Sequence, residues 1–177
     1  DRIGDVCEGD VRRMKIVHTL LATLRGMPQM LYGDELMFRS TDRSKGHPTL
    51  RVDFPGGWPG DRINLFDRAQ HTGAAKEVYD YTRQIMNWRK SKDVIHNGKT
   101  LHFIDRDNTY AFFRYNDDEV VFVYINNTNN ERVVPWERYS EISEGLDEGR
   151  NVITGQSVVM SGLKVAPMSA LVVEFAR

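Results

Sequence analysis

The side chains best able to do chemistry gather in residues 38–68, a stretch with neither helical nor strand periodicity. Arg51, Asp53 and Trp58 lie there among closely spaced prolines and glycines. A loop of this length inside a compact domain is usually functional or disordered, and its aromatic residues favour an ordered loop. Arginine forks and aromatic faces are suited to holding a polar ligand, so this stretch, called the long loop below, is the candidate binding element.

Metal and nucleophile chemistry have little support in the sequence. The single cysteine, Cys7, can form neither an internal disulfide nor a cysteine-rich zinc site, and no neighbouring histidine would activate it. His18, His71, His96 and His102 show no spacing typical of metal ligands. We therefore expect no metal and no other cofactor in this chain, while a calcium requirement of any longer parent is left open.

Two predicted helices flank the long loop, and a predicted strand connects the first helix to it. Asp10 is a good N-cap for a predicted helix over residues 11–25, which is apolar almost all round in its second half. Residues 26–35 form an apolar run between turn residues and predict a short buried strand. Apolar side chains spaced by three and four predict a second helix over residues 74–91. A helix followed directly by a buried strand is half of an α/β repeat.

From about Gly98 the apolar pattern changes to alternation. Three antiparallel strands are predicted around residues 101–103, 110–112 and 121–125, separated by turn clusters. Shorter strands are predicted at residues 132–134, 151–153, 157–160, 163–165 and 170–175. Short strands at this spacing favour an antiparallel sandwich with Greek-key connections.

Charge and hydropathy exclude two classes of partner. The chain has 24 Lys plus Arg and 25 Asp plus Glu, a net charge of -1, which provides no footprint for nucleic acid or an anionic membrane. Its apolar runs fall short of the roughly 18 residues that span a bilayer. We therefore expect no nucleic-acid partner and no membrane span.

Two strings of residues carry a resemblance to a known family. GMPQMLYGDE, residues 26–35, resembles the eighth barrel strand of the α-amylase family of glycoside hydrolases, and RVDFPGGWPGD, residues 51–61, resembles its neopullulanase and cyclomaltodextrinase branch. The resemblance implies an α+β fragment: the last helix, strand and helix of a (β/α)8 barrel, then an antiparallel Greek-key β-sandwich. It places the barrel remnant at residues 1–95 and the sandwich at residues 96–177.

The same resemblance implies retaining hydrolysis of α-1,4-glucosidic bonds in starch, pullulan or cyclodextrins by two carboxylates. In the family these carboxylates, and a third aspartate, precede the position of Asp1, so the chain looks cut from a longer enzyme and is expected to be inactive alone. The alternative is a non-catalytic carbohydrate-binding or scaffolding module.

Arg51, His47, Trp58 and Asp53 are the substrate-binding residues that the resemblance implies. His47 stands where the family has an aspartate, which weakens that half of the contact. Arg51 could instead form a structural ion pair with Asp53 or Asp61, and Trp58 could be a buried anchor of a tight turn.

Other residues have mainly structural expectations. Asp34 and Glu35 follow a predicted barrel strand, a place that often holds catalytic carboxylates, but loop fixing is favoured. Trp136 and Tyr139 are expected to fill the sandwich core rather than bind starch.

The expected partners are an α-glucan oligosaccharide and, through an exposed apolar barrel face, either the N-terminal part of the same polypeptide or a second copy. The resemblance suggests a location in a bacterial cytoplasm or periplasm, and the sequence does not decide between these two compartments.

Overall fold

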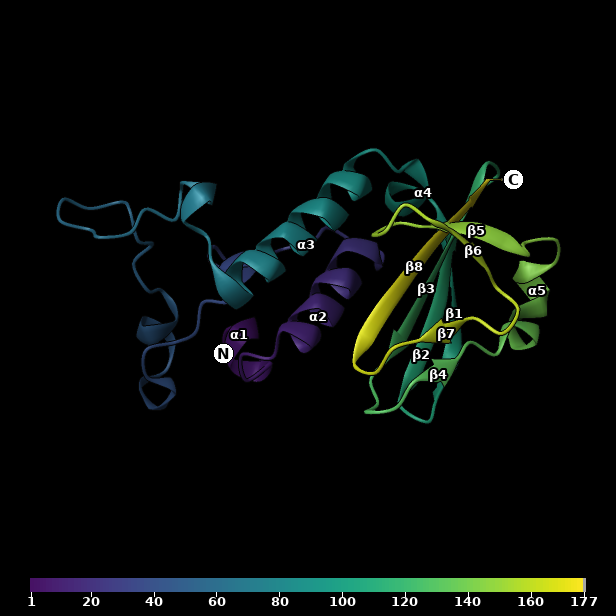
Figure 1. The fold of residues 1–177 in the computed structure, drawn as a ribbon, viewed down its shortest axis with the longest axis horizontal. Helices are drawn as coiled ribbons and strands as arrows, with labels where there is room; N and C mark the ends of the chain where they lie inside the picture. Colours follow the sequence, from purple (N-terminus) through teal and green to yellow (C-terminus); the bar gives the residue numbers. More distant parts are fainter. Residues whose placement is uncertain (177) are drawn as a thin grey trace.

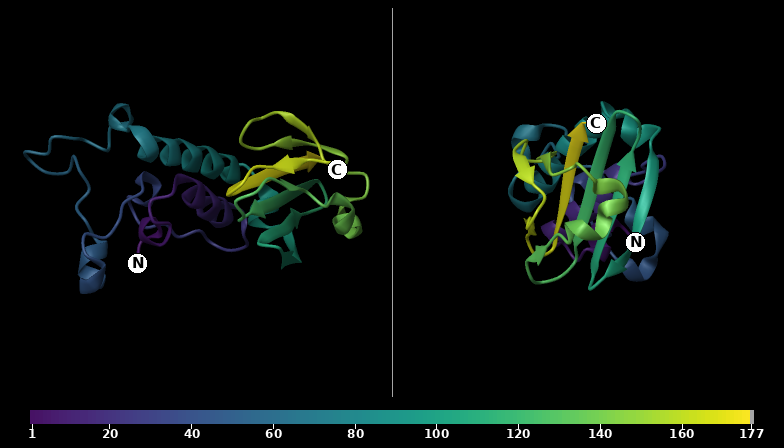
Figure 2. Two further views of the ribbon diagram at one scale, coloured as in Figure 1. Left: turned by 60° about the horizontal axis from the view of Figure 1, so that its bottom comes forward. Right: turned by 90° about the vertical axis from the view of Figure 1, so that its right-hand side faces the viewer.

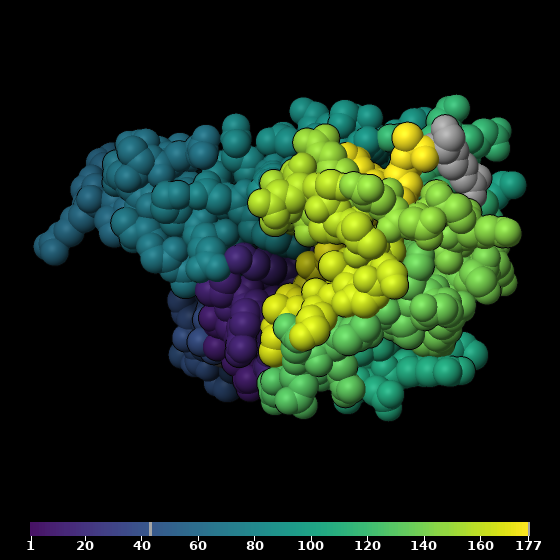
Figure 3. All heavy atoms as spheres, turned by 45° about the vertical axis from the view of Figure 1, so that its right-hand side comes forward, coloured from purple at the N-terminus to yellow at the C-terminus, as the bar shows by residue number. Residues whose placement is uncertain are grey.

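The computed structural model describes residues 1–176, with the side chains of residues 1–42 and 44–176. It has three parts in a row: the long loop, a pair of helices and a β-sheet (Figure 1). Helices α2 (Val11–Thr23) and α3 (Gly73–Lys90) lie side by side, and the ends of both reach the sheet. The long loop projects from the other end of the helix pair, away from the sheet (Figures 2 and 3).

Both long helices confirm the sequence prediction. The Asp10 carboxylate accepts a hydrogen bond of 2.8 Å from the Arg12 amide, which caps α2. Helix α2 ends two residues earlier than predicted, because Leu24 already has extended backbone angles. The helices are joined by polar contacts as well as apolar ones: the Thr19 and Tyr81 hydroxyl oxygens lie 2.6 Å apart, and Lys15 pairs with Glu77.

The sheet is antiparallel and has six strands in the order β1-β2-β3-β8-β5-β6. Its strands are β1 (Lys99–Arg106), β2 (Thr109–Tyr115), β3 (Glu119–Asn126), β8 (Ser169–Ala176), β5 (Glu148–Asn151) and β6 (Ser157–Val159). A second ladder pairs β4 (Arg132–Val133) with β7 (Lys164–Val165). All the strands predicted in this half are present, but β5 lies earlier than expected. The Asn151 side chain accepts hydrogen bonds from the Ile153 and Thr154 amides and turns the chain there.

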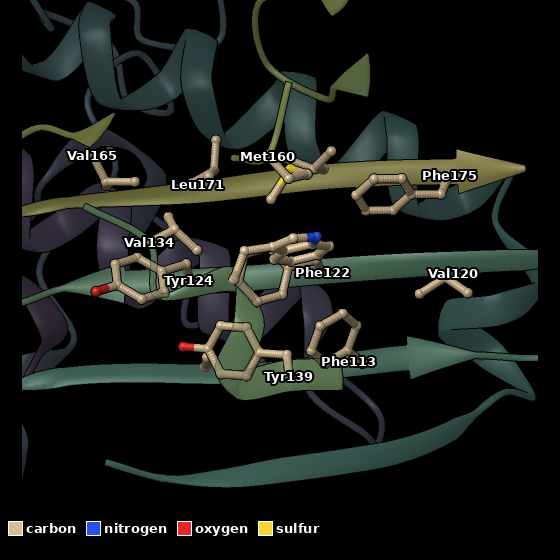
Figure 4. Close-up of a cluster of buried hydrophobic side chains, with 13 residues drawn as sticks. Phe113, Val120, Phe122, Tyr124, Val134, Tyr139, Met160, Val165, Leu171 and Phe175 are labelled. Carbon is tan, nitrogen blue, oxygen red and sulfur yellow. The ribbon is translucent and has the colours of Figure 1, made fainter. Parts of the chain in front are cut away.

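Strand β3 is buried on both sides, since each face of the sheet has its own core. Phe113, Phe122 and Phe175 point to the face covered by β4, β7 and the short helices η5 (Trp136–Tyr139) and α5 (Ser140–Ser143), as Figure 4 shows. The alternate residues Phe112 and Val121 pack against α2, α3 and α4 (Asp93–His96). The sheet is therefore the middle layer, with sandwich-like packing on one face only.

The predicted strand over residues 26–35 is wrong. These residues form no strand, and Met27, Leu31 and Tyr32 are exposed to 86%, 38% and 43%. A buried strand needs neighbours on both sides, and no other segment of residues 1–176 pairs with this one. The barrel remnant that the resemblance implied is accordingly not confirmed; what the structure shows is an antiparallel sheet with a few helices.

The remaining elements are short turns of helix that connect the larger ones. They are α1 (Ile3–Val6), η1 (Asp34–Leu36), η2 (Arg43–Lys45), η3 (His47–Leu50) and η4 (Arg68–Gln70). Among the described residues, none of the helices combines the length and the apolar character that crossing a bilayer requires.

Candidate functional site

A buried arginine near the start of the chain holds the long loop in place. Arg2 is 1% exposed, and its Nε donates a hydrogen bond of 2.6 Å to the Leu50 carbonyl oxygen. Its Nη1 donates to the Tyr32 carbonyl oxygen at 2.8 Å and to the Asp34 carboxylate at 2.9 Å. One guanidinium group therefore ties the segment that precedes the long loop to the middle of the loop. This role of Arg2 was not predicted, since nothing in the neighbouring residues marks Arg2 as buried.

Asp5 provides a second anchor. Its carboxylate accepts hydrogen bonds from the Ser40 amide at 3.2 Å and from the Ser40 hydroxyl at 2.6 Å, and Arg39 approaches to 3.5 Å. Burial acts to raise the pKa of Asp5, but the hydrogen bonds from Ser40, Arg2 and Arg39 together outweigh it and hold this pKa below its usual value. Asp5 is therefore an ionised clamp on the first residues of the loop.

Asp34 and Glu35 are neighbours with different surroundings. Burial raises the pKa of Asp34, although Arg2 acts in the opposite direction, and the Asp34 carboxylate is taken up by the ion pair with Arg2. This confirms the loop-fixing interpretation for Asp34. Glu35 is half-buried and faces a hollow instead of a cation.

That hollow has a volume of about 420 Å³ and lies between the long loop and helix α3. It is lined by Tyr32, Glu35, Leu36, Phe54, Leu65, Phe66 and Tyr79. The Phe54 ring lies 4.6 Å from the Phe66 ring and 5.4 Å from the Phe38 ring, measured between centroids. Aromatic rings with one carboxylate suit a polar ligand that has apolar faces. This hollow was not predicted from the sequence, because the directions of its side chains depend on how the loop folds back onto α3.

The tight turn at residues 56–61 is held by a carboxylate. One Asp61 oxygen accepts hydrogen bonds from the Gly56 amide at 2.7 Å and the Trp58 amide at 3.1 Å. Gly56 has a φ of 102°, and a Cβ atom there would lie 2.2 Å from an Asn64 oxygen, so glycine is required. Trp58 is 65% exposed, so the alternative in which it is the turn's buried anchor is wrong.

Arg51, His47 and Asp53 are all exposed. His47 begins η3, and Arg51 follows its last residue. Among the described residues Arg51 forms no ion pair, so the proposed pairing with Asp53 or Asp61 is absent. The loop presents these side chains together with Trp58, but no hydrogen bond, ion pair or ring contact of the structure joins the four.

The other candidates have structural roles. Trp136 and Tyr139 are 7% and 1% exposed and belong to the sheet core, which confirms core filling and excludes them as a surface platform. Burial raises the pKa of the Cys7 thiol, and Cys7 is 3% exposed. Within the described residues, no group of three or more His, Cys, Asp or Glu side chains is arranged to hold a metal ion.

Comparison with known proteins relates the sheet to one domain family. Residues 100–174 match the family described as the cyclo-malto-dextrinase C-terminal domain. This range begins within β1 and ends within β8, so the match includes part or all of every strand of the six-stranded sheet and its covering ladder.

Two curated relatives extend the match beyond that domain. A cyclomaltodextrinase of Geobacillus thermopakistaniensis is 26% identical over 76% of this chain, and a maltogenic α-amylase of Bacillus acidopullulyticus is 26% identical over 73%. The aligned part covers 20% of each relative, so the chain spans about one fifth of their length. These full-length relatives are glycoside hydrolases.

A solved structure shares the fold over nearly the whole chain. An α-amylase from Geobacillus thermoleovorans, complexed with acarbose, superposes with a TM-score of 0.63 at 20% identity, over 94% of this chain and 33% of that one. This likeness shows a shared fold. Residues 100–174 match the cyclo-malto-dextrinase C-terminal domain, and together with the similarity to both curated relatives this match supports a C-terminal fragment of the cyclomaltodextrinase branch of the α-amylase family.

Proposed function

We propose that this chain is the C-terminal part of a retaining α-glucan hydrolase that cleaves α-1,4-glucosidic bonds in starch, pullulan or cyclodextrins. The catalytic carboxylates come from residues that precede Asp1, and this chain contributes a wall of the substrate groove. The names of the curated relatives, and the acarbose complex of the Geobacillus α-amylase, support a glucan as the substrate.

The proposal rests on a contrast within the long loop between its fixed backbone and its free side chains. Its backbone is fixed by the buried Arg2–Asp34 pair, while Arg51 and Trp58 stay exposed without side-chain partners among the described residues. A fixed backbone with free side chains keeps a binding surface in place before a ligand arrives. In this proposal Arg51 donates to glucose hydroxyls, Trp58 stacks on a sugar face, and His47 and Asp53 complete the contact.

Residues 27–31 have a separate role in the proposal. Their exposed methionine and leucine side chains form an apolar surface that suits contact with another polypeptide segment. This segment would pair with the N-terminal part of the same polypeptide. When the chain is isolated, the same surface drives self-association, so light scattering at micromolar concentration should detect a species larger than a monomer.

An activity assay tests the catalytic part. The isolated chain should not hydrolyse soluble starch, pullulan or β-cyclodextrin, whereas the polypeptide extended upstream of Asp1 should release reducing sugar from at least one of them. Turnover by the isolated chain, in a preparation free of the longer protein, would overturn the placement of the carboxylates. An inactive extended protein would favour the binding or scaffolding alternative.

A binding assay tests the loop. Titration of the extended protein with acarbose should quench tryptophan fluorescence, because Trp58 is exposed while Trp136 is buried. Arg51→Gln should weaken acarbose binding about tenfold, the effect of about 1.4 kcal/mol. Arg13→Gln is the matched control, since Arg13 is an exposed arginine on α2 paired only with Glu8. Equal affinities for the Arg51→Gln and Arg13→Gln proteins would remove Arg51 from the site.

A further inference from the structure

A second hollow lies in the β-sheet part. Figure 1 shows that this part of the chain lies at the opposite end from the long loop. Its volume is about 290 Å³, and it opens between the β1–β2 turn, strand β4 and the start of η5. It is lined by Arg106, Asp107, Thr109, Tyr124, Arg132, Val133, Pro135 and Arg138. The glucan-binding proposal makes no use of this hollow.

The charge of this hollow is unbalanced. Three arginines line it against one carboxylate, Asp107, and none of the three belongs to an ion pair among the described residues. Arg132 is half-buried, and its Nε is shielded from solvent without a hydrogen-bond partner. A shielded guanidinium donor without an acceptor is costly, so the Arg132 Nε would gain from donating to an anion in the hollow.

The three arginines come from elements that the fold holds firmly. Arg106 ends β1, and its carbonyl accepts a hydrogen bond of 2.7 Å from the Thr109 hydroxyl. Arg132 lies in β4, opposite Val165 of β7. Arg138 donates to the Ile104 carbonyl, and its guanidinium carbon lies 5.9 Å from the Tyr139 ring centroid. A strand end, a ladder and a helical turn thus hold the backbones from which the three arginine side chains extend around one space.

We propose that this hollow, the arginine pocket, binds a phosphate group, as the free ion or as a phosphate monoester. Guanidinium forks match the geometry of phosphate oxygens, and two or three of them offset a doubly negative group. Exposed Val133 and Pro135 offer an apolar rim for the body of an ester. The pocket does not depend on glucan hydrolysis, so it stands or falls separately.

Calorimetry of the 177-residue chain tests the proposal. Inorganic phosphate, glucose 6-phosphate and glucose are titrated at pH 7.5 and constant ionic strength, because phosphate contacts weaken with salt. Phosphate and glucose 6-phosphate should each bind saturably, while glucose should not bind at the arginine pocket. Tighter binding of the ester than of the ion would identify a monoester as the source, and equal binding would identify the free ion.

Substitutions then assign the binding to the pocket. Arg106→Gln and Arg132→Gln should each weaken phosphate binding about tenfold. Arg106 is exposed, so that variant should keep the wild-type melting temperature even if Arg132→Gln lowers it. Arg13→Gln should bind as the wild type does. Absence of saturation, equal weakening in the Arg13→Gln control, or unchanged binding in both pocket variants would overturn the proposal.

Discussion

The aromatic residues of the sheet and those of the long loop are placed in opposite ways. In the sheet, the Phe122 ring lies 5.0 Å from Trp136 and 4.8 Å from Phe113, and Phe122 has no exposed surface. In the loop, Trp58 and Phe66 are 65% and 68% exposed. The same kind of side chain thus contributes to stability in one region and is left available for contact in the other.

The difference comes from what fixes the backbone in each region. Strand pairing and alternation bring the sheet rings into one cluster, so their burial drives folding. The loop backbone is held by polar groups, namely Arg2, Asp5 and Asp61, and does not need its aromatic rings for support. Ring removal should therefore destabilise the sheet, whereas anchor removal should release the loop.

The largest expected effect is the loss of a sheet ring. Phe122→Ala should lower the free energy of unfolding by about 4 kcal/mol, because it leaves a cavity among packed rings. Urea unfolding followed by circular dichroism measures this change. A loss below about 1 kcal/mol would mean that the ring cluster is not the stabilising core described here.

The next effect belongs to the loop anchor. Arg2→Met leaves the Asp34 carboxylate buried without its partner, which should favour opening of the loop by about 3 kcal/mol, or about a hundredfold. Limited proteolysis should show faster cleavage within residues 38–68, while unfolding of the sheet stays near the wild-type value. Arg12→Met, at an exposed arginine, is the control. Equal cleavage rates in the two variants would show that the buried pair does not hold the loop.

A buried histidine in the helix pair between the two regions should make the stability of the chain depend on pH. His18 has no exposed surface, and burial lowers its pKa from 6.5 to about 4. The unfolded chain takes up a proton near pH 6.5 and the folded chain only near pH 4, so stability falls as the pH drops through this window. The contribution of His18 to this loss is about 2 kcal/mol at pH 5.

Unfolding at pH 7.5 and pH 5.0 measures this effect in the wild type and in His18→Gln. The glutamine can still bond Thr82, whose hydroxyl oxygen lies 2.6 Å from the His18 Nδ1, but it cannot take up a proton. The variant should therefore lose about 2 kcal/mol less between the two pH values. Equal losses in the two proteins would show that the pKa of His18 does not differ between the folded and the unfolded chain.

The smallest effect is expected at the exposed ring of the loop. Trp58→Ala should change the free energy of unfolding by less than about 0.5 kcal/mol, because the turn is held by Asp61 and not by the indole. The same variant of the extended protein should bind acarbose more weakly. A large stability loss would show that Trp58 is an anchor, and unchanged binding would exclude it from the site.

Several elements could be predicted from the local pattern of residues in the sequence. The Asp10 cap and the spacing of apolar residues predicted both long helices, and alternation predicted β1, β2, β3 and β8. The strings at residues 26–35 and 51–61 indicated the family before any comparison. These features succeed because caps, periodicity and turn residues act over a few neighbouring positions.

Other features depended on partners far apart in the chain. The apolar run at residues 26–35 has the composition of a strand, but a strand exists only where another backbone pairs with it. From the sequence, Trp58 could be either exposed or buried, because its surroundings are set by how the loop folds.

The sequence by itself determined the helices, the antiparallel strands and the resemblance to a branch of the α-amylase family, since each is encoded in residues close to one another. Only the tertiary structure decided that Arg2 is buried beneath the long loop and that Arg106, Arg132 and Arg138 surround one hollow. Local periodicity carries no information about which distant side chains meet; that depends on the packing of the elements and on which polar groups are then shielded from water.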